Sequence, residues 1–239
     1  MTIVILTVLI FLAQIGAKVF FDESFGYLSI LLSQICVVVI PGLLYFAAKD
    51  RKIGDYISVP KKFLFSIPMA IITVISVNIL TQYINYPIIK FIKLPAGNGT
   101  IYNSTYELII TIILLCVIPA MFEEVLFRGI ILEELSDRFS SRRGAIFITA
   151  AIFAAVHLDF SNLIPQFILG AILCHITLAE KSVLTAMIAH FANNLFSIIL
   201  REQFSSYYSS YGILLFLLSV LLTTIGVVYF KKKASRREI

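Results

Sequence analysis

Two adjacent carboxylates and an arginine lie inside an otherwise apolar stretch of the sequence, Pro119 to Gly129. A charged side chain in a hydrocarbon-facing helix costs roughly 2.5–3.5 kcal/mol, so Glu123, Glu124 and Arg128 are candidates for a functional site. On a helix, Glu124 and Arg128 are four residues apart and share a face, in the order that favours an ion pair. Glu123 points about 100° away from Glu124, because a helix turns once in 3.6 residues. The spacing therefore predicts that Arg128 neutralises Glu124 while Glu123 faces a different surface that water can reach.

A buried ion pair that locks two helices together is the purely structural alternative for this cluster. That alternative accounts for Glu124 and Arg128, but it leaves the carboxylate of Glu123 without a partner. We therefore take Glu123 as the candidate reactive group and the other two side chains as its support.

Two further apolar segments each carry a histidine in an i, i+4 pair. Phe153-Ala-Ala-Val-His157 places Phe153 one turn before His157, and His190-Phe-Ala-Asn-Asn194 places His190 and Asn194 along one stripe. A single intramembrane histidine usually serves structure. Polar clusters on three separate helices, however, turn toward the interior of a bundle and meet there.

Together these side chains have the chemistry to hydrolyse an amide bond. A carboxylate and a neutral imidazole can activate a water molecule, which is the role predicted for Glu123 and His157. An imidazole N–H and an amide N–H can stabilise the oxyanion that forms, which is the role predicted for His190 and Asn194. Ser182, Ser197 and the three cysteines have no flanking base at helical spacing, and neither Gly-x-Ser-x-Gly nor His-Glu-x-x-His occurs.

The same groups have an alternative use as metal ligands. Glu123, His157 and His190 could bind a divalent metal such as zinc, with a fourth position left open. We predict that no metal cofactor is required, because asparagine is a poor zinc ligand and the pair of His190 and Asn194 suits an oxyanion better.

The composition shows what kind of protein must position these groups. The chain has 239 residues, of which 59% are hydrophobic and 14% are charged, and its mean hydropathy is +0.97. These values indicate a polytopic protein that is integral to a lipid bilayer. The net charge is +5, and the basic residues lie in loops beside apolar segments. They show no pattern of a basic groove, so no nucleic-acid binding is expected. No Cys-x-x-Cys occurs, and the three cysteines lie in apolar runs: Cys36, Cys116 and Cys174.

Eight apolar windows are long enough to cross a bilayer, which takes about 20 residues. We predict an all-α fold with transmembrane helices at about residues 2–21, 27–48, 63–84, 106–135, 143–158, 163–178, 182–200 and 211–230. In the fourth helix, Pro119 leaves the carbonyl of Leu115 without a helical N–H donor and predicts a kink ahead of the charged cluster. After the third helix, an interfacial piece is predicted to begin at Ile88.

The basic residues predict how the helices are oriented. Of the 19 Lys and Arg residues, fourteen lie in or beside the connections that follow the second, fourth and sixth helices and in the C-terminal tail, four lie on the other side, and Arg128 lies within the membrane. Both termini are therefore predicted to be cytoplasmic. By content, the chain divides into residues 1–106 with three helices and an external linker, 107–200 with the catalytic core, and 201–239 with the last helix and a basic tail.

Glu-Glu-x-x-x-Arg, Phe-x-x-x-His and His-x-x-x-Asn, in this order on successive core helices, resemble the motifs of the CAAX-protease and bacteriocin-processing family, also called the Abi family. These intramembrane endopeptidases include the type II CAAX prenyl proteases. The resemblance covers residues 119–194, and every motif position is intact. It implies an eight-helix bundle with a cavity open to the cytoplasmic leaflet. Members of the family are often labelled metalloproteases, although a glutamate-dependent mechanism without metal fits the best-described ones.

The resemblance also implies a substrate. Eukaryotic members cleave near the C-terminus of prenylated proteins, and bacterial members process peptide precursors or confer immunity to bacteriocins. We therefore expect an intramembrane endopeptidase of the bacterial cell membrane that acts on a peptide or protein at the membrane. The alternative is a non-catalytic immunity or regulatory protein that uses the same cavity to bind a bacteriocin, a peptide or a membrane partner. A transporter is disfavoured because the sequence shows no inverted repeat.

Overall fold

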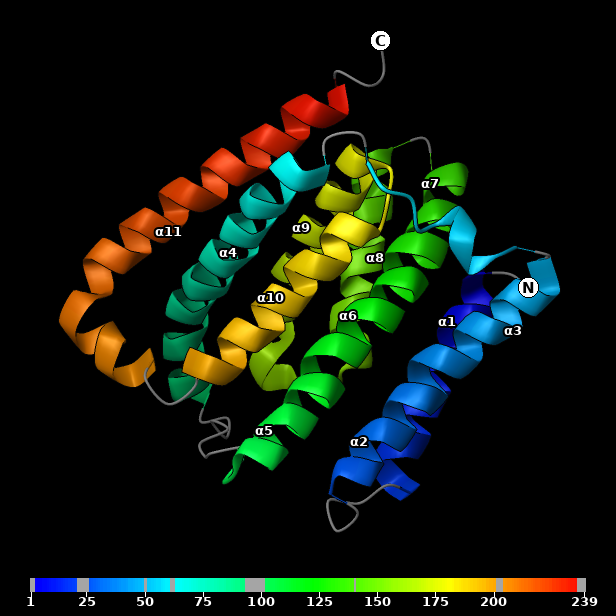
Figure 1. Cartoon of the computed structure of the whole chain (residues 1–239), viewed down its shortest axis with the longest axis horizontal. Coiled ribbons are helices and arrows are strands. Elements are labelled where there is room, and N and C mark those ends of the chain that lie inside the picture. Colours follow the sequence, from blue (N-terminus) through cyan, green and yellow to red (C-terminus); the bar gives the residue numbers. More distant parts are fainter. Residues whose placement is uncertain are drawn as a thin grey trace.

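The computed structural model describes residues 3–20, 26–49, 51–60, 63–92, 102–139, 141–200 and 204–235, and every regular element within them is a helix (Figure 1). This architecture confirms the predicted all-α membrane fold. By length and composition, six helical segments of the described chain can cross a membrane: Ile3–Phe20, Tyr27–Lys49, Phe63–Ile92, Thr105–Arg138, Phe160–Glu180 and Gly212–Ser235.

The helices follow the predicted windows along the chain. They are α1 (Ile3–Phe20), α2 (Tyr27–Gln34), α3 (Ile40–Lys49), α4 (Phe63–Ile92), α5 (Thr105–Ile112), α6 (Ile118–Glu123), α7 (Leu132–Arg138), α8 (Arg142–Val156), α9 (Leu163–Glu180), α10 (Leu184–Leu200) and α11 (Phe204–Ser235). Three π-helical stretches, η2 (Ile35–Val39), η4 (Ile113–Val117) and η5 (Glu124–Ile131), join α2 to α3 and α5 to α7 without a break. The described chain thus contains about eight helical passes, of which α8 and α10 are the shorter ones.

Two proline-containing segments refine the sequence prediction. Where the sequence predicts a kink ahead of the charged cluster, the helix contains the π-helical stretch η4, which ends at Val117, shortly before Pro119. The predicted end of the third helix at about residue 84 is wrong, because α4 continues through Pro87 to Ile92 and includes the start of the predicted interfacial piece. A proline removes one backbone donor but does not end a helix whose neighbouring turns remain bonded. Residues 93–101 of the predicted external linker lie outside the described residues.

The helices pack in two groups that meet at α8 and α9 (Figure 1). α4, α9, α10 and α11 surround one buried apolar cluster, whereas α1, η2, α3, η5, α7 and α8 share another. α11 runs along α4, where Gly226 approaches Thr73 so closely that a Cβ on the glycine would overlap with the threonine side chain. This close contact fixes the last helix against the third pass of the bundle.

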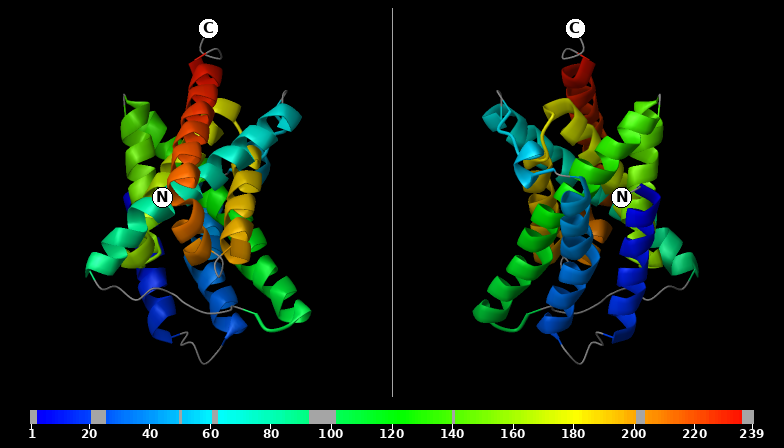
Figure 2. Two further views of the ribbon diagram at one scale, coloured as in Figure 1. Left: turned by 90° about the vertical axis from the view of Figure 1, so that its left-hand side faces the viewer. Right: turned by 90° about the vertical axis from the view of Figure 1, so that its right-hand side faces the viewer.

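The basic segments gather at one end of the bundle, here called the basic end and formed by residues 49, 51–60, 138–139, 141–143, 181–183 and 231–235. Lys49 of α3 forms an ion pair with Glu134 of α7 at 3.2 Å. The backbone N–H of Val183 donates to the carbonyl of Tyr56, which ties two of the connections together. The first turn of α1 and the last turns of α11 also lie toward this end (Figures 1 and 2). This grouping agrees with the predicted orientation, in which these segments share the cytoplasmic side.

The opposite end of the bundle, here called the distal end, contains residues 18–20, 26–27, 102–105 and 157–162. Nζ of Lys18 at the end of α1 donates to the carbonyl of Leu158 after α8, at 2.8 Å. Nδ2 of Asn85 in α4 donates to the carbonyl of Ser161 at 2.6 Å. The first, third and fifth passes are therefore joined directly where they reach the distal end.

Candidate active site

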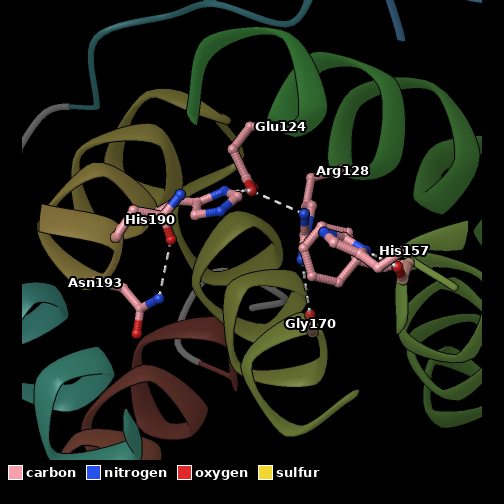
Figure 3. Close-up of polar contacts among 8 residues, drawn as sticks. Glu124, Arg128, His157, Gly170, His190 and Asn193 are labelled. Atoms are coloured by element: carbon pink, nitrogen blue, oxygen red, sulfur yellow. Dashed lines mark hydrogen bonds and ion pairs between the residues drawn. The ribbon is translucent and has the colours of Figure 1, made fainter. Parts of the chain in front are cut away.

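Glu124 of η5 lies at the centre of a buried cluster of polar side chains (Figure 3). Its Oε1 accepts a hydrogen bond from Nη1 of Arg128 at 2.7 Å, so the predicted ion pair is present. The same oxygen lies 2.7 Å from Nδ1 of His190 on α10. A carboxylate only accepts, so Nδ1 of His190 carries the proton and donates it. The glutamate is thus held by two donors from two helices, and only the arginine was expected from the spacing.

Phe153 of α8 is the packing centre between these polar groups. Its ring meets the ring of His157 edge-on with centroids 4.9 Å apart, and the ring of His190 with centroids 6.0 Å apart. Cζ of Arg128 lies 4.2 Å from the centroid of Phe153, which is a cation–π contact in a buried setting. One aromatic ring therefore orients both imidazoles and the guanidinium.

The backbone of α9 approaches this ring closely at Gly170. A Cβ on Gly170 would lie 3.2 Å from Cα of Ala150 and 3.2 Å from Cδ1 of Phe153, which is tighter than ordinary contact. Nη2 of Arg128 lies 3.5 Å from the Gly170 carbonyl, at the limit of a hydrogen bond (Figure 3). The missing side chain of Gly170 thus lets α9 close the rear of the site.

His157 follows the last residue of α8 and is half-buried. Its Nδ1 lies 2.7 Å from the carbonyl of Phe153. Because a carbonyl only accepts, Nδ1 carries the proton, and Nε2 of the neutral ring is left as an acceptor. The next residue, Leu158, has φ of 49°, in the left-handed region that non-glycine residues seldom adopt. The hydrogen bond from Lys18 to the Leu158 carbonyl holds this turn.

Glu123 and His157 line one cavity of about 260 Å³. Glu123 is buried, with 6% of its surface exposed. Among the described residues, no hydrogen bond or ion pair engages its carboxylate. The structure therefore shows the two neighbouring carboxylates on different surfaces: Glu123 in the cavity, and Glu124 in the ion pair behind it.

The opposite wall of the cavity is polar and comes from the first two passes. It consists of Gln14 on α1 together with Ser29, Ser33 and Gln34 on α2. None of these residues belongs to the three sequence motifs. The signal was nevertheless present, because polar side chains in membrane helices turn toward the bundle interior, and Ser29 and Ser33 are spaced one turn apart.

Asn194 belongs to a separate hydrogen-bonded chain. Its Nδ2 donates to the carbonyl of Leu115 at 3.1 Å, and its Oδ1 accepts from Nδ2 of Asn193 at 3.1 Å. Oδ1 of Asn193 in turn accepts from Nδ2 of Asn78 on α4 at 2.9 Å. Neither Asn194 nor His190 lines the cavity. The structure thus brings Glu123 and His157 to one cavity, and it reveals two amides, Asn78 and Asn193, that the motifs did not indicate.

The alternative set of metal ligands does not gather at one point. Within the described part of the chain, no group of three or more His, Cys, Asp or Glu side chains could hold a metal ion. His190 uses Nδ1 for Glu124, and Glu123 and His157 line a cavity that His190 does not reach. The residues present therefore do not fit the three-ligand zinc site, and independence from metal stays a prediction.

The site lies within the part of the chain that matches a known family. Residues 105–196, less than half of the chain, match the family model described as type II CAAX prenyl endopeptidase Rce1-like. No curated protein and no solved structure matches the chain. The matched stretch begins with α5 and contains Glu123, His157, His190 and Asn194. The match supports the resemblance drawn from the three motifs, because residues 105–196 of this membrane protein are similar to the type II CAAX prenyl endopeptidases.

Proposed function

We propose that this protein is an intramembrane endopeptidase of the bacterial cell membrane that hydrolyses a peptide bond of a membrane-associated peptide, either prenylated-like or a precursor. One observation carries the proposal. The unpaired carboxylate of Glu123 and the imidazole of His157 come from different helices and line the same cavity. A water molecule between them would meet two proton acceptors, because Nδ1 of His157 is already committed to Phe153.

The proposed reaction uses both acceptors on one water molecule. One hydrogen of the water faces Glu123 and the other faces Nε2 of His157. Glu123 takes its proton as the water oxygen attacks the carbonyl carbon of the peptide bond. The C–N bond then breaks, and the proton passes from Glu123 to the departing amine, so that a carboxylic acid and an amine leave.

The remaining motif residues support this reaction from behind the cavity. Arg128 and His190 hold Glu124, and through Phe153 this buried group sets the position of the His157 ring. We retain Asn194 and His190 as donors to the oxyanion, although each has at most one side-chain N–H left for it. Asn194 has one amide N–H left after Leu115 takes the other, and His190 has only Nε2 left, when that nitrogen carries a proton.

The proposal is tested by comparing the peptides that cells release and retain. Membrane and secreted peptides from the wild type, a deletion strain and strains with Glu123→Gln or His157→Asn are compared by mass spectrometry, with protein abundance measured in each. We expect both variants to accumulate normally and to match the deletion strain. Asp137→Asn is the matched control, because Asp137 is an exposed carboxylate on the same continuous helix. Wild-type peptide patterns in both variants would reject hydrolysis and favour a binding protein.

A further inference from the structure

The cavity lies in the half of the bundle away from the basic end. On the second pass its lining runs from Ser29, close to the start of that pass at Tyr27, to Val38, and it stops well short of Lys49 at the basic end. On α8 it is lined by Val156 and His157, at the end of the helix that reaches the distal connections.

The other half of the same interface is filled by apolar side chains. On α1 the buried residues are Ile3, Leu6 and Ile10 in the first half, and only Ala17 after them. These side chains belong to one buried cluster with residues of α3, η5 and α7, among them Tyr45, Ile130, Ile131 and Leu135. Nearer the basic end, the Tyr45 hydroxyl donates to Oε1 of Glu134 at 2.7 Å, and Lys49 pairs with the same carboxylate. Among the described residues, packed side chains therefore occupy the interface between the basic end and Glu123, whereas Ser29 and Ser33, nearer the start of the second pass, are partly exposed.

The polar wall of the cavity has hydrogen-bonding groups to offer. Oε1 of Gln34 is buried without a hydrogen-bond partner in the described chain. The side chains of Gln14 and Ser33 likewise form no hydrogen bond to any described residue, whereas Oγ of Ser29 donates to the carbonyl of Gly26 at 2.7 Å. Polar groups left unpaired inside a membrane protein are costly, so a ligand that supplies both N–H and C=O groups is favoured there. A peptide backbone supplies both at every residue.

The charge of the cavity limits which peptides fit. None of the described residues that line it is a lysine or an arginine, and Glu123 contributes a carboxylate. A free C-terminal carboxylate would meet this negative group without a cation to offset it. An uncharged internal stretch of peptide has no such conflict.

We infer, on the basis of the proposed function, that the substrate is an uncharged internal stretch of peptide that enters the cavity from the distal end and bonds its backbone to Gln14, Ser33 and Gln34. The positive-inside prediction places this end on the extracytoplasmic side of the membrane. This route differs from the cytoplasmic opening that the family resemblance implies.

The entry side is tested by labelling single cysteines in intact cells. In a chain with Cys36, Cys116 and Cys174 replaced by alanine, a cysteine is introduced by Ser33→Cys in the cavity, Thr105→Cys at the distal end, or Lys52→Cys at the basic end. A membrane-impermeant maleimide added outside should label the first two variants and spare the third until the cells are permeabilised. Labelling of Ser33→Cys only after permeabilisation, or not at all, overturns the inference. Labelling of Lys52→Cys from outside overturns the extracytoplasmic entry.

This test is independent of turnover, so its failure is distinct from a failure of the proposed hydrolysis. The binding role of the wall has a kinetic test on a substrate identified in the peptide comparison. Gln34→Leu should raise KM about five- to tenfold, the effect of losing roughly one hydrogen bond, with kcat nearly unchanged. Ile35→Leu, which alters the adjacent exposed side chain, is the matched control. A wild-type KM for Gln34→Leu, or undiminished cleavage of a substrate with aspartate next to the scissile bond, overturns the assignment of the wall.

Discussion

The side-chain amide of Asn194 donates to the carbonyl of Leu115 at 3.1 Å, and Pro119 has no N–H that could bond that carbonyl in an α-helix. The amide on the seventh pass thus supplies the hydrogen bond that the proline on the fourth pass cannot donate. The amide of the third motif connects α10 to the helix that carries both glutamates.

Asn194→Ala should lower both stability and activity. Loss of the donor to Leu115 should cost about 1–3 kcal/mol of unfolding free energy. Loss of an oxyanion donor should cost on the order of 10²–10³ in kcat. Adding Pro119→Ala restores a backbone N–H for the Leu115 carbonyl, so the double variant should regain thermal stability in detergent but not activity. If the double variant recovers both, Asn194 serves structure alone.

Arg128→Ala should reduce the amount of folded protein. It removes one of the two donors to the buried carboxylate of Glu124, and breaking a buried ion pair costs about 3–5 kcal/mol. Abundance in membranes and thermal unfolding would measure the loss. Glu124→Leu combined with Arg128→Met removes both charges and should restore much of the abundance, because no buried charge is left unpaired. Activity should stay low in this double variant, since Nδ1 of His190 has lost its acceptor.

Lys18→Met should lower kcat and leave KM unchanged. The lysine holds the carbonyl of Leu158, the left-handed residue that follows His157, so its loss frees the turn that positions the imidazole. Lys18→Arg keeps a donor and should retain activity. Leu158→Gly added to Lys18→Met removes the steric cost of the left-handed turn, about 1 kcal/mol, and should recover part of kcat. An unchanged kcat in Lys18→Met would show that the turn at Leu158 keeps its conformation without the lysine.

The purified protein should keep its activity in strong chelator. The reaction proposed for Glu123 and His157 needs no metal ion, and the described residues hold no three-ligand group. Activity and metal content are measured before and after chelation, with a zinc-dependent protease treated in parallel. Loss of stoichiometric zinc together with activity, and recovery of both when zinc is added back, would contradict this expectation.

Features set by neighbours along the chain could be predicted from the sequence. The passes follow from apolar length, and the ion pair of Glu124 with Arg128 and the ring contact of Phe153 with His157 follow from i, i+4 spacing. The grouping of the basic segments follows from their charge. Each of these depends only on the helical repeat or on solvation by the membrane.

Only the tertiary structure decided which helices share the cavity and which partner each motif residue takes. Contacts such as Glu124 with His190, Asn194 with Leu115, and the wall of Gln14 and Gln34 opposite Glu123 depend on how far each helix is rotated and how deep it lies. Hydropathy does not specify rotation or depth, because one apolar helix face is much like another to lipid. Those two quantities come from packing of the kind seen at Gly170, where the shape of one helix admits its neighbour at a single position.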